Sequence, residues 1–190
     1  MFFRSERLFL RPVWPEDWQA ILNGIADEGV VKNLARAPWP YGEAEARWFA
    51  GLSHDTRYPA SLIVRPQNGE VIGGIGLAPH EQGAELGYWI ARQHWGQGYA
   101  SEAARAMLTL AGVIGHKYLV AHHFLDNPAS GRVLTRLGFR PTGAIVEHAC
   151  MARGGTVPAA AYALALDEAG DCDDDPDGLG PEDGMMRKAA

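Results

Sequence analysis

The chain has 190 residues, of which 47% are hydrophobic and 21% charged, and its formal net charge is −6. This composition excludes collagen-like, coiled-coil and wholly disordered proteins, and the length suits one domain with its own core. Two cysteines are too few for a disulfide framework, and the charged start lacks the apolar run of a signal peptide. No stretch approaches the roughly 18 apolar residues of a membrane span. We therefore expect a soluble, cytoplasmic protein that does not bind membranes.

The charge is distributed unevenly along the chain. Residues 167–190 contain nine acids and two bases, whereas residues 1–166 contain 15 bases and 14 acids. A nearly neutral body argues against nucleic-acid binding, which usually requires a basic surface. The last segment is rich in Gly, Asp and Pro and too poor in apolar residues to form a core. We expect one domain over 1–166 and a disordered acidic tail over 167–190, which either solubilises the protein or binds a partner.

The first half of the chain contains both helix and strand patterns. Trp18, Ile21, Leu22 and Ile25 recur at helical spacing, and Pro-Gln-Asn-Gly at 66–69 is a strong hairpin signal. The elements expected here are a strand at 8–13, a helix with Pro15 and Glu16 in its first turn, a loop at 38–42, a helix at 43–52, and strands at 61–64, 71–77 and 84–90.

The second half begins with a glycine-containing loop and a long helix at 99–115, whose apolar residues share one face. The elements expected after it are a strand at 118–124, a helix at 128–137, and strands at 139–150 and 159–166. Antiparallel hairpins followed by one strand–helix–strand crossover, which should place its two strands side by side, define an α+β domain. No internal repeat or linker interrupts this order.

The loop at 93–100, Gln-His-Trp-Gly-Gln-Gly-Tyr-Ala, is the most informative segment. Gly96 and Gly98 precede a helix, where a backbone without Cβ atoms can direct several N–H groups at one anion. The positive end of the helix dipole adds to that site, so phosphate or pyrophosphate is the expected ligand. Tyr99 stands where a P-loop needs lysine, and Ser101 breaks the dinucleotide fingerprint. The alternative is a plain turn that leads into a buried helix.

Four motifs follow one another along the chain: Arg7-Leu8-x-Leu10-Arg11-Pro12; the segment 85–90; Gln93-x-x-Gly96-x-Gly98; and Asn127-x-x-Ser130 with Leu137-Gly138-Phe139. The glycine motif matches the Arg/Gln-x-x-Gly-x-Gly/Ala motif of the GNAT superfamily of N-acetyltransferases, and the resemblance covers nearly all of residues 5–166. The other three resemble the RimJ/RimL-like branch, which includes ribosomal-protein N-terminal acetyltransferases. This implies the GNAT fold, a mixed, mostly antiparallel sheet of six to seven strands flanked by helices, with a V-shaped splay between strands 4 and 5.

The resemblance also implies that acetyl-CoA is the cosubstrate. In the family its pantetheine arm pairs with the fourth strand like an extra strand, and backbone N–H groups of the glycine loop hold the pyrophosphate. Asn127 would bond the pantetheine, although Asn before Pro128 also fits a helix N-cap, and both roles can hold. The implied cofactor-binding residues are Trp89, Ile90, Ala91, Gln93, His94, Trp95, Gly96, Gln97, Gly98, Tyr99, Ala100 and Asn127.

The implied reaction is attack of a neutral amine on the thioester carbonyl. Amines with a pKa of about 8 to 10 are mostly protonated at neutral pH, so a base assists. Glu85 occupies the fourth-strand position where several members place a glutamate; it is otherwise a solvated strand-edge acid, and Glu147 or water alone are the alternatives. Leu134 stands where many members have a tyrosine. Ser130 matches the branch's serine, which implies that it protonates the leaving CoA thiolate, unless it only bonds its own backbone.

No metal is expected. His122 and His123 alternate across a strand and have no Cys or carboxylate pair at ligand spacing, so together they cannot bind one ion. Three aromatic residues, Trp39, Tyr41 and Trp48, either line the acceptor pocket or simply pack over the core.

Three classes of function remain after these observations. The leading hypothesis is an acetyl-CoA-dependent N-acetyltransferase acting on a peptide α-amine or a small amine. The stretch 154–162 lacks the Asp or His that ribosomal-protein enzymes of the branch often carry there, which argues against a ribosomal-protein acceptor. A non-catalytic acyl-CoA-binding module and an unrelated nucleotide-binding protein are the alternatives. Both a monomer and a homodimer are compatible with the sequence.

Overall fold

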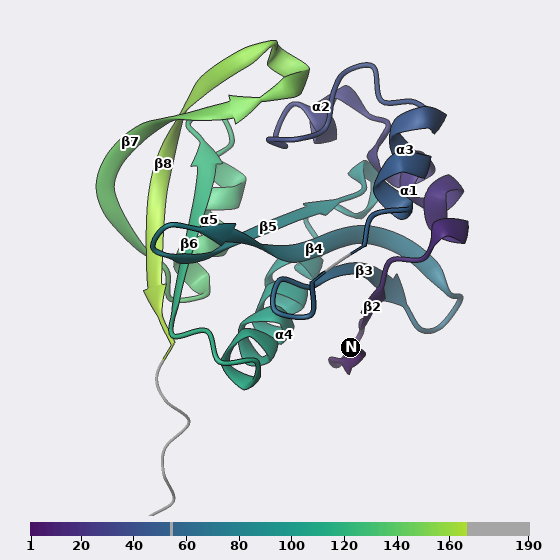
Figure 1. Ribbon diagram of the computed structural model, residues 1–190, viewed down its shortest axis with the longest axis horizontal. Coiled ribbons are helices and arrows are strands. Elements are labelled where there is room, and N and C mark those ends of the chain that lie inside the picture. The colour runs from purple at the N-terminus through teal and green to yellow at the C-terminus, as the bar shows by residue number, and fades with distance from the viewer. Residues whose placement is uncertain (54, 167–190) are drawn as a thin grey trace, which may run out of the picture.

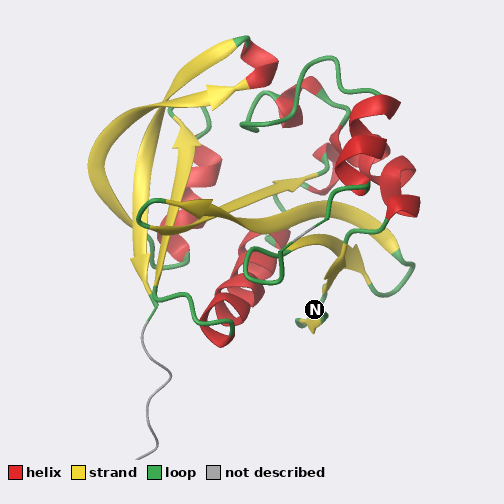
Figure 2. Ribbon diagram, viewed as in Figure 1, coloured by secondary structure: helices red, strands yellow, loops and turns green. Residues whose placement is uncertain are grey.

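The structure, a computed structural model, describes residues 1–53 and 55–166. The acidic tail expected at 167–190 lies outside these residues. One mixed sheet with helices on both faces makes up the described part (Figures 1 and 2). Its elements are β1 (Phe3–Arg4), β2 (Phe9–Pro12), α1 (Trp18–Ile25), α2 (Glu28–Val31), α3 (Glu43–Ala50), β3 (Ala60–Arg65), β4 (Glu70–His80), β5 (Gly83–Ile90), α4 (Tyr99–Val113), β6 (Tyr118–Phe124), α5 (Pro128–Arg136), β7 (Arg140–Cys150) and β8 (Gly155–Ala165).

The strand order is β1-β2-β3-β4-β5-β6-β8-β7. Neighbouring strands are antiparallel except for β5 and β6, which are parallel because α4 carries the chain across the sheet between them. The expected crossover therefore places its two strands side by side. The Pro-Gln-Asn-Gly turn joins β3 to β4, and Gly69 adopts a φ of +69° there, a conformation that glycine reaches without strain.

Two helical layers cover the sheet because neighbouring strand residues face opposite sides. Ile63 packs with Met107 of α4 in the larger core, which also holds Leu134 of α5. Leu62, the residue beside Ile63, packs with Ile21 of α1 in the second core. The long helix and the glycine loop before it therefore lie on one face, and α1 to α3 lie on the other.

The sheet splays at its centre. Only two residue pairs, Ala84 with Leu119 and Glu85 with Val120, connect β5 to β6. At that end the strands approach so closely that a Cβ on Gly83 would collide with the carbonyl oxygen of Tyr118. Beyond these pairs the two strands separate, and the opening between them positions the site described below.

The expected mixed sheet and central splay are present, but the sheet has eight strands rather than six to seven. The additional strand is β1, in which Phe3 and Arg4 pair with Leu10 and Phe9. The one-turn helix α2 was also not predicted; the Asp27 side chain caps it by accepting a bond from the Val30 N–H. Within the described residues, no helix has the length and hydrophobicity that crossing a membrane requires.

Candidate active site

A cavity of about 500 Å³ opens where β5 and β6 separate. Its wall combines β5, the loop before α4, the start of α5, the end of β6 and part of β7 with the segment 30–35. Side chains from both faces of the sheet line it. On β5, Leu86 packs in the core beneath α4, whereas Trp89 packs in the core with α1 and α2. The cavity therefore passes through the sheet from the α4–α5 face to the α2 face.

Most of the expected cofactor-binding residues line this cavity. Those that do are Trp89, Ile90, His94, Trp95, Gly96, Gly98, Tyr99, Ala100 and Asn127, and those that do not are Ala91, Gln93 and Gln97. Their assignment to acetyl-CoA remains a prediction, because it depends on a ligand.

The glycine loop has the geometry that an anion site needs. Gly96 and Gly98 have φ values of +74° and +80°, and Gly98 is the N-cap of α4, so the free N–H groups of the first helical turn lie beside the cavity. Arg7 braces the loop by donating from Nη1 to the Gln97 carbonyl at 3.2 Å and from Nε to Glu102 at 2.7 Å. The loop is thereby tied to the first turn of its own helix.

Two backbone groups at the end of β5 already have partners within the chain. The indole N–H of Trp95 donates to the Ile90 carbonyl at 2.6 Å, and the Ala91 N–H donates to the Ile72 carbonyl at 2.9 Å. The Ile90 oxygen keeps a second lone pair, but the Ala91 N–H has no further hydrogen to offer. An extended ligand beside β5 would therefore pair with other groups than the Ala91 N–H.

Ser130 lies against a tyrosine that the residue patterns did not single out for catalysis. The Tyr88 hydroxyl and the Ser130 Oγ are 2.8 Å apart, and both residues line the cavity. Burial raises the pKa of Tyr88, although its bond to Ser130 opposes the shift, so the phenol keeps its proton. Asn127 caps α5 by accepting a 3.4 Å bond from the Ser130 N–H, which shows the N-cap role. Leu134 is 1% exposed and belongs to the core.

Glu85 lies between two histidines at the α2 side of the cavity. Its Oε1 accepts a bond from His122 Nδ1 at 2.8 Å and another from His148 Nε2 at 3.1 Å. The three side chains come from β5, β6 and β7 and are 23%, 12% and 23% exposed. We call these residues the Glu85 cluster. Glu85 is thus a partly buried, bonded carboxylate and not a solvated strand-edge acid.

The two histidines strongly acidify Glu85. Burial alone would raise the pKa of this carboxyl, but the hydrogen bonds and charges of His122 and His148 outweigh burial and hold it well below its usual range. In turn, the bond to Glu85 raises the pKa of His148, and partial burial only weakens this effect. A carboxylate with so low a pKa is a weak proton acceptor at neutral pH.

The sequence missed His148, and it misjudged which residues could surround an ion. His122 and His123 do face opposite sides, since His123 lies 3.3 Å from the Tyr162 hydroxyl. However, His148 supplies the second imidazole, and the donor atoms of the Glu85 cluster lie within 4.8 Å of one another, close enough to hold a metal ion. The 2.8 and 3.1 Å separations are those of hydrogen bonds, so protons account for the cluster as it stands. That no metal binds remains a prediction.

Glu147, the second choice for the base, is on the wrong side of its strand. It is exposed and does not line the cavity, whereas its neighbour His148 does. Strand alternation is the signal that could have found His148, because Val146 and Cys150, at two-residue spacing, also turn inward.

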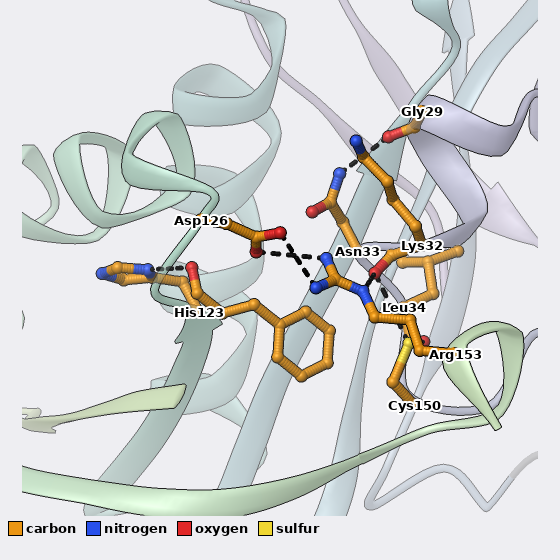
Figure 3. Close-up of polar contacts among 9 residues, drawn as sticks. Gly29, Lys32, Asn33, Leu34, His123, Asp126, Cys150 and Arg153 are labelled. Atoms are coloured by element: carbon orange, nitrogen blue, oxygen red, sulfur yellow. Dashed lines mark hydrogen bonds and ion pairs between the residues drawn. The ribbon is translucent and has the colours of Figure 1, made fainter. Parts of the chain in front are cut away.

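A set of contacts connects the β7–β8 hairpin to the segment after α2 (Figure 3). Arg153 donates from Nε to the Lys32 carbonyl at 2.9 Å and forms a two-point ion pair with Asp126 at 2.9 and 3.1 Å. The buried Cys150 Sγ lies 3.4 Å from both the Lys32 and the Leu34 carbonyl oxygens, which share its one hydrogen. Together with a bond from the Met151 N–H to the Ala35 carbonyl, these contacts form what we call the roof over the α2 side of the cavity.

The three aromatic residues weighed as pocket residues do not line the cavity. Tyr41 is buried in the second core, which raises its pKa to about 12, and Trp39 and Trp48 are exposed. The packing interpretation therefore holds for Tyr41.

The mixed sheet with its central splay is the arrangement that the resemblance to the GNAT superfamily implies. A family model described as an acetyltransferase (GNAT) domain matches residues 7–140. An uncharacterized N-acetyltransferase of Bacillus subtilis, YoaA, is 30% identical over 151 residues, which cover 76% of this chain and 85% of that protein. The ribosomal-protein-serine acetyltransferase of Escherichia coli is 35% identical over 100 residues, or 50% of this chain and 55% of that protein.

Solved structures share the fold. RimL, a ribosomal α-N-protein acetyltransferase in complex with coenzyme A, superposes with a TM-score of 0.72 at 23% identity and covers 88% of this chain and 99% of its own. The chain belongs to the GNAT acetyltransferase family, and its relatives support the RimJ/RimL-like branch. It is an N-acetyltransferase by family.

Proposed function

We propose that this protein transfers the acetyl group of acetyl-CoA to a primary amine, by direct attack while both substrates are bound. The observation that best supports this proposal is the cavity that passes through the sheet, with the glycine loop at one end and the Glu85 cluster at the other. Acetyl-CoA enters from the α4–α5 face, with its pyrophosphate on the glycine loop and its pantetheine arm beside β5. The amine enters from the α2 face.

The roles of the side chains follow from this placement. The Glu85 cluster receives a proton from the acceptor ammonium, and a β5 backbone N–H stabilises the oxyanion of the tetrahedral intermediate. Ser130, hydrogen-bonded to Tyr88, protonates the leaving thiolate. No step in this scheme uses a metal, and a cytoplasmic location would supply the acetyl-CoA.

The acceptor is a slender amine, either the first residue of a peptide or a small molecule. The roof supports this proposal, because it bridges the segment after α2 and the β7–β8 hairpin over the acceptor side of the cavity. A slender chain end fits beneath such a bridge more easily than a lysine on a folded surface.

The test is acetyl-CoA binding by calorimetry, followed by CoA release with peptides that begin with Ser, Ala or Gly and with spermidine. Gly96→Asp should weaken acetyl-CoA binding at least about tenfold, because its carboxylate repels the pyrophosphate. A Cβ at Gly96 meets nothing within 4 Å, but its φ of +74° strains any residue other than glycine, so the variant needs a control for strain. Gly96→Asn controls for shape, and Gly143→Asp, at a distant glycine with a φ of +83°, controls for backbone strain.

The results separate the proposal from its alternatives. Wild-type affinity in Gly96→Asp would reject the phosphate role of the loop. Tight acetyl-CoA binding without CoA release for any amine would favour the acyl-CoA-binding module, and tighter binding of ATP or NAD would reject both.

A further inference from the structure

The protons of the Glu85 cluster can be assigned from its hydrogen-bond partners. A carboxylate oxygen that accepts two bonds requires a hydrogen on each of the two nitrogens that face it. Glu85 Oε1 faces His122 Nδ1 and His148 Nε2, so both of these nitrogens are protonated. Glu85 itself is ionised, in line with its lowered pKa.

His148 has no lone pair left. Its second nitrogen, Nδ1, lies 3.3 Å from the Ala149 carbonyl oxygen, which can only accept. With an acceptor at each nitrogen, His148 is doubly protonated and forms an imidazolium beside the Glu85 carboxylate, which agrees with its raised pKa. It therefore supplies charge and cannot take a proton.

His122 is different because only one of its nitrogens has a partner. Its Nδ1 donates to Glu85, and its Nε2 forms no hydrogen bond with any residue that the structure describes. A neutral imidazole protonated at Nδ1 carries its lone pair on Nε2. His122 also lines the cavity, which places its ring in the wall that, under the proposed function, the acceptor amine reaches.

Resting on the proposed function, we infer that His122 is the general base, that Glu85 is the residue that orients it, and that the His148 imidazolium holds Glu85 in place. The arrangement of carboxylate, imidazole Nδ1–H and free Nε2 is the one by which acid–imidazole pairs accept protons in other enzymes. The titratable groups in contact with His122 among the described residues are Glu85 on β5, His148 on β7, with its ring 4.8 Å away, and His80 on β4, with its ring 6.0 Å away. The charge of Arg36 also acts on the cluster, where it opposes the rise in the pKa of His148.

The reaction balances with His122 in this role. His122 Nε2 takes one proton from the acceptor ammonium, and the freed nitrogen lone pair forms the bond to the thioester carbonyl carbon. When the tetrahedral intermediate collapses, the C–S bond breaks and the amine nitrogen loses its second proton. One proton ends on the CoA sulfur, delivered through Ser130, and the other leaves with His122 to solvent.

The first test measures which ring nitrogens of His122 and His148 are protonated, in the absence of any acceptor amine. Long-range proton–nitrogen NMR of histidine rings at pH 7 should show His122 protonated at Nδ1 only and His148 protonated at both nitrogens; His122→Asn and His148→Gln assign the signals. A His122 protonated at Nε2 instead would overturn the inference. This result is independent of whether any amine is acetylated, so it is separable from a failure of the proposed function.

The second test is kinetic and uses the Ser-starting peptide and spermidine as acceptors. His122→Asn keeps a donor toward Glu85 but removes the base, so kcat/KM should fall about 10²- to 10⁴-fold while acetyl-CoA affinity stays unchanged. His80→Asn removes the nearby imidazole that does not line the cavity and should stay within about twofold of wild type. Wild-type turnover in His122→Asn would overturn the inference.

Glu85→Gln distinguishes a positioning role from a direct one. If Glu85 acts through His122, this variant should keep measurable activity, and the acidic limb of its pH–rate profile should move to lower pH, because no carboxylate then stabilises the protonated imidazole. If Glu85 were the base itself, the variant would lose that limb, and His122→Asn would be the milder substitution.

Discussion

The two ends of the cavity are built in different ways. At the α4 end, the proposed anion site is backbone from eight consecutive residues, 93–100, with the dipole of the following helix behind it. At the α2 end, the site is made of side chains from β5, β6 and β7, and its two ends, Glu85 and His148, are 63 residues apart. The first site is local, and under the proposed function it would serve any CoA ester. The second depends on tertiary structure, and under the same proposal it would determine which amine reacts.

This comparison predicts that substitutions at one end leave the other end intact. Glu85→Ala should have the largest effect on stability, lowering the free energy of unfolding by about 2 to 3 kcal/mol, because it leaves the buried parts of two histidines unpaired. Urea unfolding measures the loss, and calorimetry should show unchanged acetyl-CoA affinity. Glu81→Ala, at an exposed acid of the neighbouring loop, is the control and should be neutral. An affinity loss of tenfold in Glu85→Ala would show that the two ends are coupled.

A change of pH should lower the free energy of unfolding less than Glu85→Ala does, because at any pH only one of Glu85 and His148 loses its charge. The pKa of Glu85 is lowered by folding, so its stabilisation is full above the unfolded pKa of about 4.3 and is lost as the pH falls further. The pKa of His148 is raised, so its stabilisation is full below about 6.5 and declines as the pH rises beyond that. Wild type should therefore exceed His148→Gln in stability most clearly between pH 5 and 6.5, in urea titrations at fixed salt. An equal difference at pH 8.5 would contradict the assigned charge.

Ser130→Ala should lower kcat by about tenfold or less, below the usual range for general acid–base catalysis, because a thiolate can leave without first receiving a proton. Tyr88→Phe should have a similar effect, and the double variant should lose little more, since the two hydroxyls act through one hydrogen bond. Single-turnover acetylation measures the chemical step. If the fold-losses in kcat of the two single variants multiplied in the double variant, Ser130 and Tyr88 would act independently.

Arg153→Ala should have the smallest effect, a rise of about three- to fivefold in the KM of the amine with unchanged acetyl-CoA affinity. Asp126 is more than half exposed, so the ion pair itself contributes about 1 kcal/mol or less. The expected change comes from a loosened roof. Arg140→Ala, at an exposed arginine at the start of β7, is the matched control. If Arg153→Ala changed the affinity for acetyl-CoA, the roof would act on the CoA side of the cavity and not on the acceptor side.

Local patterns in the sequence were sufficient for most of the fold. The helical spacing from Trp18 predicts α1, the Pro-Gln-Asn-Gly turn predicts the β3–β4 hairpin, and the glycines before Tyr99 predict the start of α4. Each of these depends on residues a few positions apart. The pairing of Phe3 and Arg4 into β1 was missed because two residues contain no periodicity.

The candidate site was predictable only in part. Glu85 and Ser130 follow from motif resemblance, but their partners His148 and Tyr88 depend on which strands lie together. Alternation correctly separates His122 from His123, yet it does not reveal that a third strand brings another imidazole to His122. Tyr41 shows the opposite error: an aromatic residue that could have lined a pocket packs in the second core instead.

Because β5 and β6 pair at only two positions, the sheet between them is open, and this bears on the order in which substrates bind. The opening beyond Glu85 and Val120 reaches both faces of the sheet, so under the proposed function the thioester and the amine arrive through separate entrances. Neither has to leave before the other enters, so initial-rate plots should intersect and not run parallel. Desulfo-CoA should compete with acetyl-CoA but not with the amine.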